Sequence, residues 1–537
     1  MSANRRGPVP SILRSFAGFL HVAALAVCAA ACGGSSSGSN PPPPVAPVVS
    51  LPASLSFGTV LLGATSPPMS VTLTNTGTAP LAFTSNPALS GANAADFSIT
   101  AATCSTAAQV AANASCTVTL TFKPTLLTEN ATLTFSDNAA NSPQTVAVAG
   151  TAAQMLTNVI PLTVDAGPVP NITFDANVPF ISVTVCVPGT ATCQTIDHIV
   201  VDTGSEGLRL LSPPANITLP QVMIGANNLA SCVSFLDTTF LWGPVQLADV
   251  QLGGETASNV PVQIVEPPGF SAVPNACSAM GKDIGNVNKF GGNGIIGVGP
   301  FLQDCGSFCV TQIPTSPNIP PYFTCVPNTD TCAPATVALA SQIQNPVSML
   351  PAPDNNGVVV QLPPVGSTGA PTVTGSLILG IGTQGNNGLG SAILLAADNF
   401  GNITTTFNGT MYTGSFIDSG SNGIFLLDAA HSGLPDCATN QAPGFSCPNG
   451  TIPFSVVNSS NRSPAASAPA NFSIANALTL FNANGGLNAG FNNLGGPFGS
   501  PPLEFDFGLS FFFGRSVFTG IEGRMGPTGV SGPYFAY

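Results

Sequence analysis

The chain has 537 residues; 44% are hydrophobic, only 6% are Asp, Glu, Lys or Arg, and the formal net charge is −13. Charged residues make up about 25% of a typical soluble domain. The apolar content predicts packed cores and argues against disorder, and the acidic balance argues against nucleic acid and anionic lipid surfaces as partners. The length is enough for two or three domains.

Residues 1–31 have the pattern of a lipoprotein signal peptide. Arg5, Arg6 and Arg14 lead the apolar stretch "FAGFLHVAALAVCAAAC", which is too short for a typical spanning helix. "AAAC" ends at Cys32 and resembles a lipobox, with Ala29 at the position of the usual Leu. We expect Cys32 to carry the lipid; a plain cleaved signal is the alternative.

Residues 32–47 are rich in Gly, Ser and Pro and are typical of a tether that holds a domain away from a membrane. No later segment reads as a spanning helix, so we expect membrane contact through the lipid anchor only. Gly33 is not an acidic retention signal. The expected location is therefore the outer membrane, with the protein facing the periplasm or the cell surface.

The cysteines predict disulfides, because Cys28 leaves with the signal, Cys32 would carry lipid, and twelve others remain in an exported chain. Zinc is the competing interpretation, but matched His or CxxC spacings are missing, so no metal and no cofactor are expected. Sequence does not fix connectivity. Pairing nearest neighbours gives Cys104–Cys116, Cys186–Cys193, Cys232–Cys277, Cys305–Cys309, Cys325–Cys332 and Cys437–Cys447.

Residues 48–152 alternate apolar and polar side chains with the period of two that predicts strands of a β-sandwich, as in "MSVTLTNTG", "SCTVTLTFKP" and "TLTFSDNA". The order of "LSFGTVLLG", "VTLTNTGTAPL", "DFSI", "ASCTVTLTFKP" and "SPQTVAVAGTA" resembles the Ig-like domain named after abnormal spindle protein and hydin. That resemblance implies a spacer or binding platform.

Residues 159–537 are again rich in predicted strands, and one helix is predicted over 335–344. An eleven-residue pattern occurs twice, as "VDTGSEGLRLL" from Val201 and "IDSGSNGIFLL" from Ile417. "FGGNGIIGVGP" follows the first copy and "LSFFFGRSVFTGIEG" follows the second; in each an apolar run meets a glycine, Gly297 and Gly514. Two lobes of one plan, about 159–368 and 369–537, explain these pairs.

The duplicated pattern and its ordered companions resemble the pepsin-like aspartic peptidases. "VQLADVQLGGETASNVPVQIV", "ATVALASQIQNPVS" and "GSLILGIGT" are similar to further segments of that family. The nearest relatives are expected among bacterial lipoproteins of unknown function. The resemblance implies an all-β fold, an Ig-like sandwich followed by a bilobal pepsin-like domain, and a peptide or protein in the cleft between the lobes.

The resemblance also implies site residues. Asp202 and Asp418 would be the catalytic pair, because two facing carboxyl groups share one proton and serve as base and acid. Thr203 and Ser419 would tie the two loops together. Gly204 and Gly420 would let the backbone approach the carboxylates. Ser205 and Ser421 would hydrogen-bond the outer carboxylate oxygens.

The chain departs from the family at the flap over the cleft, where a Tyr is usual. Phe235 or Leu236 stands near that place, and Trp242, the only Trp, either covers the cleft or is an ordinary half-buried aromatic residue. Glu206 beside the first motif is also unusual. His198, four residues before Asp202, is interpreted as a packing residue. A Ser-His-Asp hydrolase would need a nucleophile framed by glycines and a partner His, and His431 alone does not make that case.

Two functions follow from these patterns. The first is a lipid-anchored aspartic-type endopeptidase outside the cytoplasm, favoured by the two intact acids. The second is a catalytically silent peptidase-fold lipoprotein that serves as a surface binding or adhesion module, favoured by the missing flap Tyr.

Overall fold

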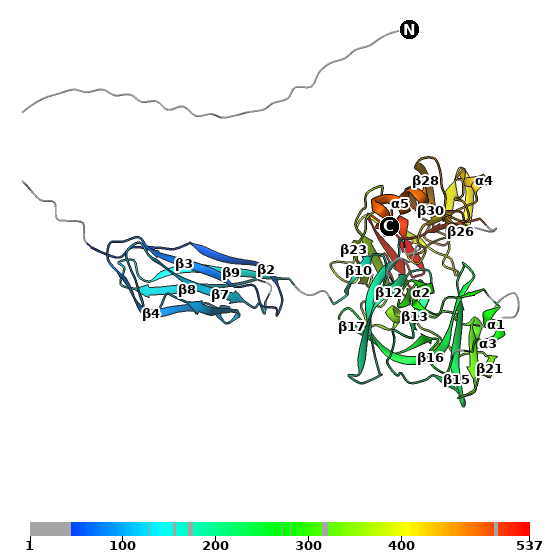
Figure 1. Cartoon of the computed structure of the whole chain (residues 1–537), viewed down its shortest axis with the longest axis horizontal. Coiled ribbons are helices and arrows are strands. Elements are labelled where there is room, and N and C mark those ends of the chain that lie inside the picture. The colour runs from blue at the N-terminus through cyan, green and yellow to red at the C-terminus, as the bar shows by residue number, and fades with distance from the viewer. Residues whose placement is uncertain are drawn as a thin grey trace, which may run out of the picture. The chain divides into compact units, whose positions relative to one another are not determined.

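The computed structural model describes residues 45–126, 128–153, 157–169, 176–270, 272–279, 281–313, 321–498 and 503–537. The predicted signal, Cys32 and most of the tether lie outside these ranges. The chain divides into two compact units, Met1–Met155 and Leu156–Tyr537. Both are built from strands, and the longest helix in the described ranges has six residues. The expected all-β class is confirmed (Figure 1).

The first unit contains two sheets around one core. A four-stranded sheet has the order β1-β3-β7-β5 and a five-stranded sheet the order β2-β9-β8-β4-β6. Alternating inward residues such as Val71, Leu73, Val118 and Leu120 are fully buried, as the period of two requires. The elements are β1 (Val49–Ser50), β2 (Ser54–Leu61), β3 (Met69–Asn75), β4 (Leu81–Ser90), η1 (Ala94–Asp96), β5 (Phe97–Ala102), β6 (Gln109–Val110), β7 (Ser115–Phe122), β8 (Thr128–Asp137) and β9 (Gln144–Ala153).

The second unit begins with strands that pair with distant segments. The strand β10 pairs both with β11 and with β23, and β22 pairs with β23 and β32, so the start, middle and end of this unit share one sheet. Its first strands and helices are β10 (Val159–Val164), β11 (Pro179–Cys186), β12 (Cys193–Asp202), β13 (Glu206–Leu211), β14 (Met223–Ile224), β15 (Asn227–Ser234), β16 (Thr239–Leu252), β17 (Glu255–Val265), α1 (Asn275–Ser278), β18 (Lys282–Asp283), α2 (Val287–Phe290), β19 (Gly294–Val298), α3 (Phe308–Thr311), β20 (Tyr322–Cys325) and β21 (Cys332–Pro334).

The later part of this unit adds a separate seven-stranded sheet, β29-β28-β25-β26-β31-β27-β30. In Figure 1, β26, β28 and β30 lie above β12 and β13, and β15 and β16 lie below them. The remaining elements are η2 (Leu339–Ser341), η3 (Pro346–Met349), β22 (Gly357–Leu362), β23 (Val373–Leu379), β24 (Leu394–Ala396), β25 (Ile403–Phe407), β26 (Thr410–Ile417), β27 (Ile424–Leu426), α4 (Ala429–Ser432), β28 (Ile452–Ser459), β29 (Ser467–Ile474), α5 (Ala477–Asn482), η4 (Ala483–Gly486), β30 (Gly495–Gly496), β31 (Phe505–Phe507), η5 (Leu509–Phe511), β32 (Arg515–Gly520) and β33 (Tyr534–Ala536).

The helix predicted over residues 335–344 is wrong. This stretch contains only the short 3-10 turn η2 and then a bridge from Gln344 to Gln303. Gln342 Nε2 donates to the carbonyl oxygens of Gly306, at 2.9 Å, and Val337, at 3.1 Å. A ten-residue helix is marginal by itself, so these side-chain and bridge contacts decide the conformation.

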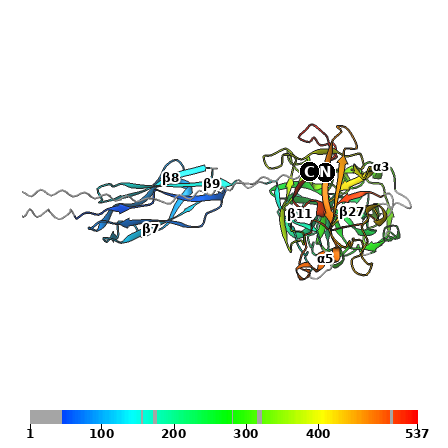
Figure 2. The ribbon, with the colours of Figure 1, turned by 90° about the horizontal axis from the view of Figure 1, so that it is seen from above.

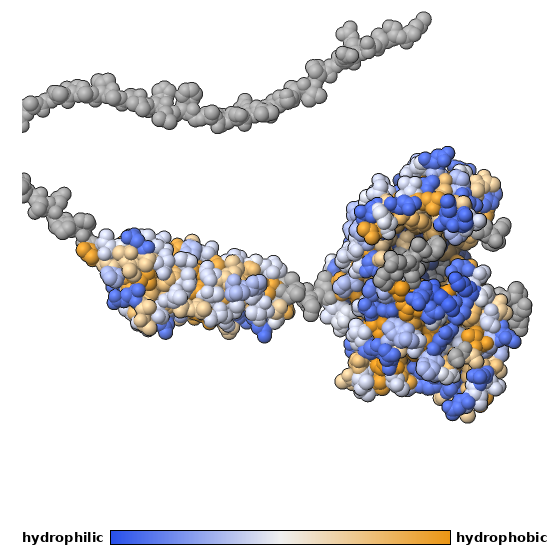
Figure 3. Space-filling view, viewed as in Figure 1, coloured by the Kyte–Doolittle hydropathy of each residue, from blue (hydrophilic) through white to orange (hydrophobic). Residues whose placement is uncertain are grey.

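The twelve described cysteines form six disulfides, and the pairs are those obtained by joining nearest neighbours. Cys232–Cys277 closes the longest segment, with a separation of 45 residues. None of the helices in the described part of the chain has the length and apolarity needed to cross a bilayer. Apolar and polar side chains are interspersed on the visible surface of each unit (Figure 3), and Figure 2 shows the strand-rich second unit from above.

Candidate active site

Two similar three-strand arrangements position the duplicated sequence. In the first repeat, defined as β12, β13 and β19, β12 runs parallel to β19 with Asp202 opposite Gly297, and β13 returns antiparallel to β19. In the second repeat, defined as β26, β27 and β31, β26 runs parallel to β31 and β27 returns antiparallel to it. Each aspartate therefore stands at the end of the first strand of its repeat.

Hydrogen bonds tie the two Asp-Thr/Ser-Gly loops together, although they are 216 residues apart. The Thr203 backbone N–H donates to Ser419 Oγ at 3.1 Å, and the Ser419 backbone N–H donates to Thr203 Oγ1 at 2.9 Å. Ser419 Oγ also donates to the Val201 carbonyl oxygen at 2.8 Å. Thr203 and Ser419 are almost fully buried, so this reciprocal contact fixes the loops against each other.

The Asp202 and Asp418 carboxyl groups face one another across these loops. A Cβ added to Gly204 would lie 2.5 Å from Asp418 Cγ, and one added to Gly420 would lie 2.5 Å from Asp202 Oδ1. Each carboxyl group therefore sits against the glycine of the opposite loop, where any larger residue would collide with it. Glycine is needed here for close approach rather than for a special backbone angle.

Each carboxyl group is also held within its own loop. The Gly204 N–H donates to Asp202 Oδ1 at 2.7 Å, and the Gly420 N–H donates to Asp418 Oδ1 at the same distance. Ser205 Oγ donates to Asp202 Oδ2, and Ser421 Oγ donates to Asp418 Oδ2 at 3.0 Å. The structure thus brings all eight residues of the predicted dyad and its support into one site.

Burial raises the pKa of Asp418 well above its usual range, and the neighbouring charges of Asp202 and Asp506 add to this effect. A hydrogen bond with the Asp202 side chain raises the same pKa further, while the Gly420 N–H lowers it. Asp418 therefore holds a proton at pH values where an exposed aspartate is ionised. A protonated carboxyl beside a second carboxyl can donate while its partner accepts, as acid–base catalysis requires.

Two further buried acids lie beside the dyad, and one of them was not found from the sequence. Glu206, beside the first motif, is 9% exposed. Burial raises its pKa, and the Asp202 charge raises it further. A hydrogen bond from the Phe301 N–H lowers the same pKa. Asp506 is 4% exposed, and burial raises its pKa to about 8. Asp506 belongs to "LEFDFG", which carries no motif, so only the strand pairing reveals its place.

Gly514 was predicted to be the counterpart of Gly297 in the second copy, and this prediction is wrong. The counterpart is Gly508. In the first repeat Gly297 packs against the Glu206 backbone; in the second, a Cβ on Gly508 would collide with the carbonyl oxygens of Gly423 and Ser421. Gly514 instead has a φ of +78° and lies next to Pro364, before β32. The prediction looked for a glycine after an uninterrupted apolar run, and "SFFFG" has one before Gly514. The strand before Gly508, "FDFG", is interrupted by the acidic Asp506.

Trp242 does not cover a cleft. Its side chain is fully buried, packs edge-on against Phe323, and belongs to a core cluster that includes Cys232 and Cys277. Phe235 is half-buried at the turn between β15 and β16, and Leu236 beside it is 83% exposed. β15 and β16 form a hairpin whose exposed apolar tip residue is Leu236, and Trp242 on β16 belongs to the core.

Neither histidine joins the dyad. His198 lies between Asp197, at 3.0 Å, and Asp165, at 3.7 Å, and packs edge-on against Phe180. His431 lies 2.6 Å from Asp428 in α4 and is exposed. Across the described ranges, no group of three or more His, Cys, Asp or Glu side chains has the arrangement of a metal site.

A model of the family described as "Protein of unknown function (DUF3443)" matches residues 153–537. The chain belongs to this family. A search of curated proteins finds no match. The DUF3443 region therefore contains both repeats, the dyad and the two additional acids.

The similarities to the following three solved structures are weak. A protein of unknown function from Porphyromonas gingivalis W83 is 15% identical with a TM-score of 0.17, over 20% of this chain and 50% of that one. The VesB protease of Vibrio cholerae is 20% identical with a TM-score of 0.16, over 19% of this chain and 31% of that one. PapD-like domain 7 of human CEP192 is 17% identical with a TM-score of 0.16, over 23% of this chain and 98% of that one. The chain thus spans half or less of the first two proteins.

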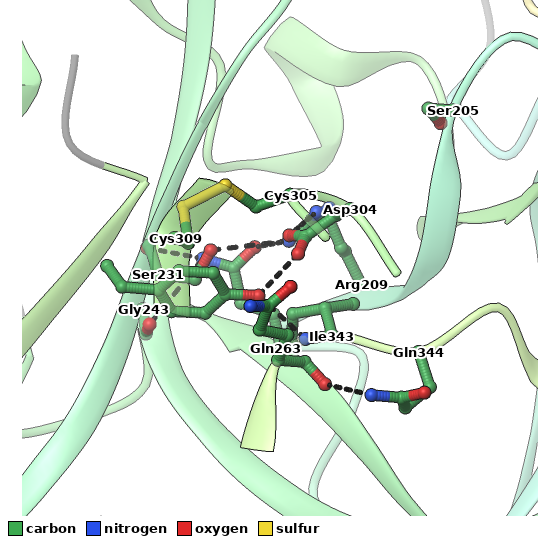
Figure 4. Close-up of polar contacts among 12 residues, drawn as sticks. Ser205, Arg209, Ser231, Gly243, Gln263, Asp304, Cys305, Cys309, Ile343 and Gln344 are labelled. Atoms are coloured by element: carbon green, nitrogen blue, oxygen red, sulfur yellow. Dashed lines mark hydrogen bonds and ion pairs between the residues drawn. A yellow bond between two sulfur atoms is a disulfide. The ribbon is translucent and has the colours of Figure 1, made fainter. Parts of the chain in front are cut away.

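A buried ion pair supports β13 of the DUF3443 region behind the dyad loop. Arg209 Nη2 lies 2.9 Å from Asp304 Oδ2, and Arg209 Nη1 donates to Gln263 Oε1 at 2.9 Å. Tyr322 Oη donates to Asp304 Oδ1 at 2.5 Å and accepts from the Ile343 N–H at 2.7 Å. In Figure 4, Ser205 lies apart from this cluster, which therefore supports the strand rather than the carboxyl group.

An apolar cluster lies beside Asp202. Val200 and Ile295 are paired across β12 and β19, two residues before Asp202 and Gly297. Alternate residues of a strand point to the same face, so these side chains share the face of the Asp202 carboxyl. The partly exposed members of this apolar cluster are Val178, Val233, Phe235, Ile284, Val287 and Phe290.

Proposed function

We propose that the protein is an aspartic-type endopeptidase that hydrolyses peptide bonds with Asp202, Asp418 and an activated water. The observation that carries this proposal is the facing of two carboxyl groups, the buried Asp202 and the partly exposed Asp418, each against the glycine of the opposite loop. A binding groove has no need for two like-charged groups in contact, since their repulsion and burial cost free energy.

The chemistry follows from one shared proton. Asp202, ionised, accepts a proton from water as the water oxygen attacks the peptide carbonyl carbon. Asp418, protonated, donates to the carbonyl oxygen. As the C–N bond breaks, Asp202 gives the proton that it took from water to the leaving nitrogen, and Asp418 takes a proton back from a hydroxyl group of the tetrahedral intermediate, which becomes the new carboxylic acid. The reciprocal Thr203–Ser419 contacts keep the carboxyl groups in reach of one water during both steps.

The substrate class in this proposal is an extended peptide with an apolar side chain on the Asp202 side. Val200 and Ile295 lie on the face of the Asp202 carboxyl and continue into the partly exposed side chains of Phe235 and Phe290. Burying an apolar side chain there contributes roughly 1.5–3 kcal/mol to binding.

The location is part of the proposal. A lipid on Cys32 would anchor the chain outside the cytoplasm, in the outer membrane, and the two-sheet first unit would act as a spacer. Six disulfides favour an oxidising compartment. Mass spectrometry of the mature protein from membranes should find an acylated Cys32.

Digestion of a peptide library from pH 3 to 8 tests the activity. We expect the wild-type protein to cleave next to apolar residues on the acid side of neutrality, and Asp202→Asn to cleave nothing. Asp165→Asn is the matched control, because Asp165 lies beside His198 and outside the dyad. Equal cleavage by wild type and Asp202→Asn would refute the proposal.

The second candidate is a surface binding module. The specific observation that favours it is the β15–β16 tip, where Leu236 is 83% exposed and no Tyr is present. Peptides that bind the wild-type protein and are recovered intact at every pH would support this candidate.

A further inference from the structure

The two repeats differ at one position next to the dyad. In the first repeat Ile295 on β19 pairs with Val200 on β12; in the second, Asp506 on β31 pairs with Phe416 on β26. The antiparallel strands give the same correspondence, because Leu208 pairs with Ile296 and Ile424 pairs with Phe507. Asp506 is therefore the equivalent of Ile295, and a carboxyl group replaces an aliphatic side chain.

The Asp506 side chain lies on the same face as the Asp418 carboxyl. Phe416 precedes Asp418 by two residues, so their side chains share one face of the strand. Asp506 is the cross-strand partner of Phe416, and such partners point to the same side. The Ser421 hydroxyl lies close to both acids, since it donates to Asp418 Oδ2 at 3.0 Å and lowers the pKa of Asp506.

Among the residues that the structure describes, no Lys, Arg or His forms a salt bridge with Asp506. It is 4% exposed, and its Oδ1 is buried with no hydrogen-bond partner among the described residues. Leaving an ionised oxygen unpaired in such a place is costly, so a proton is retained. The charged groups that shift the pKa values of Asp418 and Asp506 are themselves carboxyl groups.

The surrounding elements supply no described Lys, Arg or His side chain toward this position. Strands β27 and β30 contain no titratable residue. Glu504, just before β31, accepts from the Gly414 N–H at 2.9 Å. The titratable residues on or just beyond the strands packed around Asp506 are Tyr412, Asp418, Asp428, Glu504 and, from the other loop, Asp202.

We propose that Asp506 is a positioning residue that completes a three-carboxyl cluster with Asp202 and Asp418 and keeps the dyad singly protonated at higher pH than two carboxyls alone would. This inference rests on the proposed peptidase function. As pH rises, the cluster loses its protons one after another, and each new charge makes the next loss harder. The Asp506 charge is one of the causes that raise the pKa of Asp418.

The pH profile of kcat/KM tests this role. In Asp506→Asn the alkaline limb should move to lower pH by about one unit, because the negative charge that Asp506 acquires as it ionises near pH 8 no longer holds the proton on Asp418. The matched control is Glu255→Gln: burial and Asp354 raise the pKa of Glu255 to about 7, and it lies at the start of β17, outside both repeats. We expect its profile to match wild type. An unmoved limb in Asp506→Asn with cleavage intact would overturn the role of Asp506 and leave the peptidase proposal standing.

Thermal unfolding gives a readout that needs no activity. Asp506 keeps its proton in the folded chain to about pH 8, whereas an unfolded aspartate loses it near pH ~4. The protonated Asp506 therefore contributes fully to the free energy of unfolding below pH ~4, and this contribution is lost as the pH rises toward about 8. The Tm of Asp506→Asn should fall less steeply than that of wild type across this window.

Coupling of Asp506 to the dyad is measured by recording Tm against pH in an Asp418→Asn background. There, Asp506→Asn should change the slope of Tm with pH less than it does in the wild-type background. If the wild-type protein cleaves no peptide, the peptidase proposal fails, and the thermal unfolding measurements alone test whether Asp506 is coupled to Asp418. An equal effect of Asp506→Asn with and without the Asp418 carboxyl, or no effect at all, would overturn the cluster.

Discussion

At the scale of single residues, Asp202 and Asp418 occupy equivalent places but have different neighbours. Glu206 is the fourth residue after Asp202, whereas Asn422 stands at the same place after Asp418. Asp506 lies beside Asp418, whereas its equivalent beside Asp202 is Ile295. The two carboxyl groups thus have different surroundings, and burial with the neighbouring carboxyl groups raises the pKa of Asp418, which is why the proposed mechanism gives Asp418 the role of acid.

The buried pair of Arg209 and Asp304 gives a stability prediction at this scale. Both side chains are nearly buried, at 2% and 9% exposed, and Arg209→Met would leave Asp304 without its cation. We expect a loss of about 3–5 kcal/mol in the free energy of unfolding. Urea denaturation followed by the fluorescence of Trp242, the only Trp in the chain, measures it.

Two variants sharpen this prediction. Arg209→Met/Asp304→Leu removes both charges and should recover much of the loss. Lys289→Met breaks the exposed pair with Asp283 and should change stability by less than about 0.5 kcal/mol. Equal effects of Arg209→Met and Lys289→Met would contradict the assignment of Arg209 as a support of β13.

At the scale of elements, the strands were predictable because inward residues alternate with outward ones. "SCTVTLTF" became β7 with a strictly alternating burial pattern. The two Asp-Thr/Ser-Gly loops were predictable because identical local sequences repeat. The conformation of residues 335–344 could not be predicted from the local sequence. Gln342 donates to the Gly306 carbonyl oxygen and Gln344 forms a bridge with Gln303, and these distant contacts override the local helix preference.

Long-range register explains the other errors. Asp506 and Gly508 are placed by pairing with β26 and β27, which lie about 80 to 90 residues earlier in the sequence. Trp242 is buried against the Cys232–Cys277 disulfide and against Phe323 from β20. The strand register of Asp506 and Gly508 and the contact of Trp242 with Phe323 have no local signal, so the sequence alone could not assign these residues.

Gly508 gives the prediction at this scale. A side chain there would collide with the backbone of the loop that carries Ser421, so Gly508→Ala should displace that loop, lower stability by about 3 kcal/mol and abolish cleavage. Gly514→Ala has room and only the strain of a positive φ, about 1–2 kcal/mol. Gly388→Ala, with no atom within 4 Å of its added Cβ, is the neutral control. Urea denaturation of the three variants measures the order, and a stable, active Gly508→Ala would contradict it.

At the scale of the whole molecule, disulfides hold a chain in which charged residues are rare. Cys232–Cys277 joins β15 to α1 across 45 residues, and Cys305–Cys309 spans only four. By chain entropy, Cys232→Ala/Cys277→Ala should cost about 4 kcal/mol and Cys305→Ala/Cys309→Ala about 2 kcal/mol. Urea denaturation under non-reducing conditions compares the two. If Cys305→Ala/Cys309→Ala lowered the free energy of unfolding more than Cys232→Ala/Cys277→Ala, the chain-entropy explanation would be contradicted.

In the proposed peptidase, the two repeats bring Asp202 and Asp418 together as one catalytic unit. The most direct test is kcat for Asp202→Asn, Asp418→Asn and the double variant on one peptide that the wild type cleaves. Groups that act as a unit are not additive, so each single variant should lose at least about a thousandfold and the double variant no more than either. A single variant that keeps a tenth of the wild-type rate, or losses that multiply in the double variant, would contradict the claim.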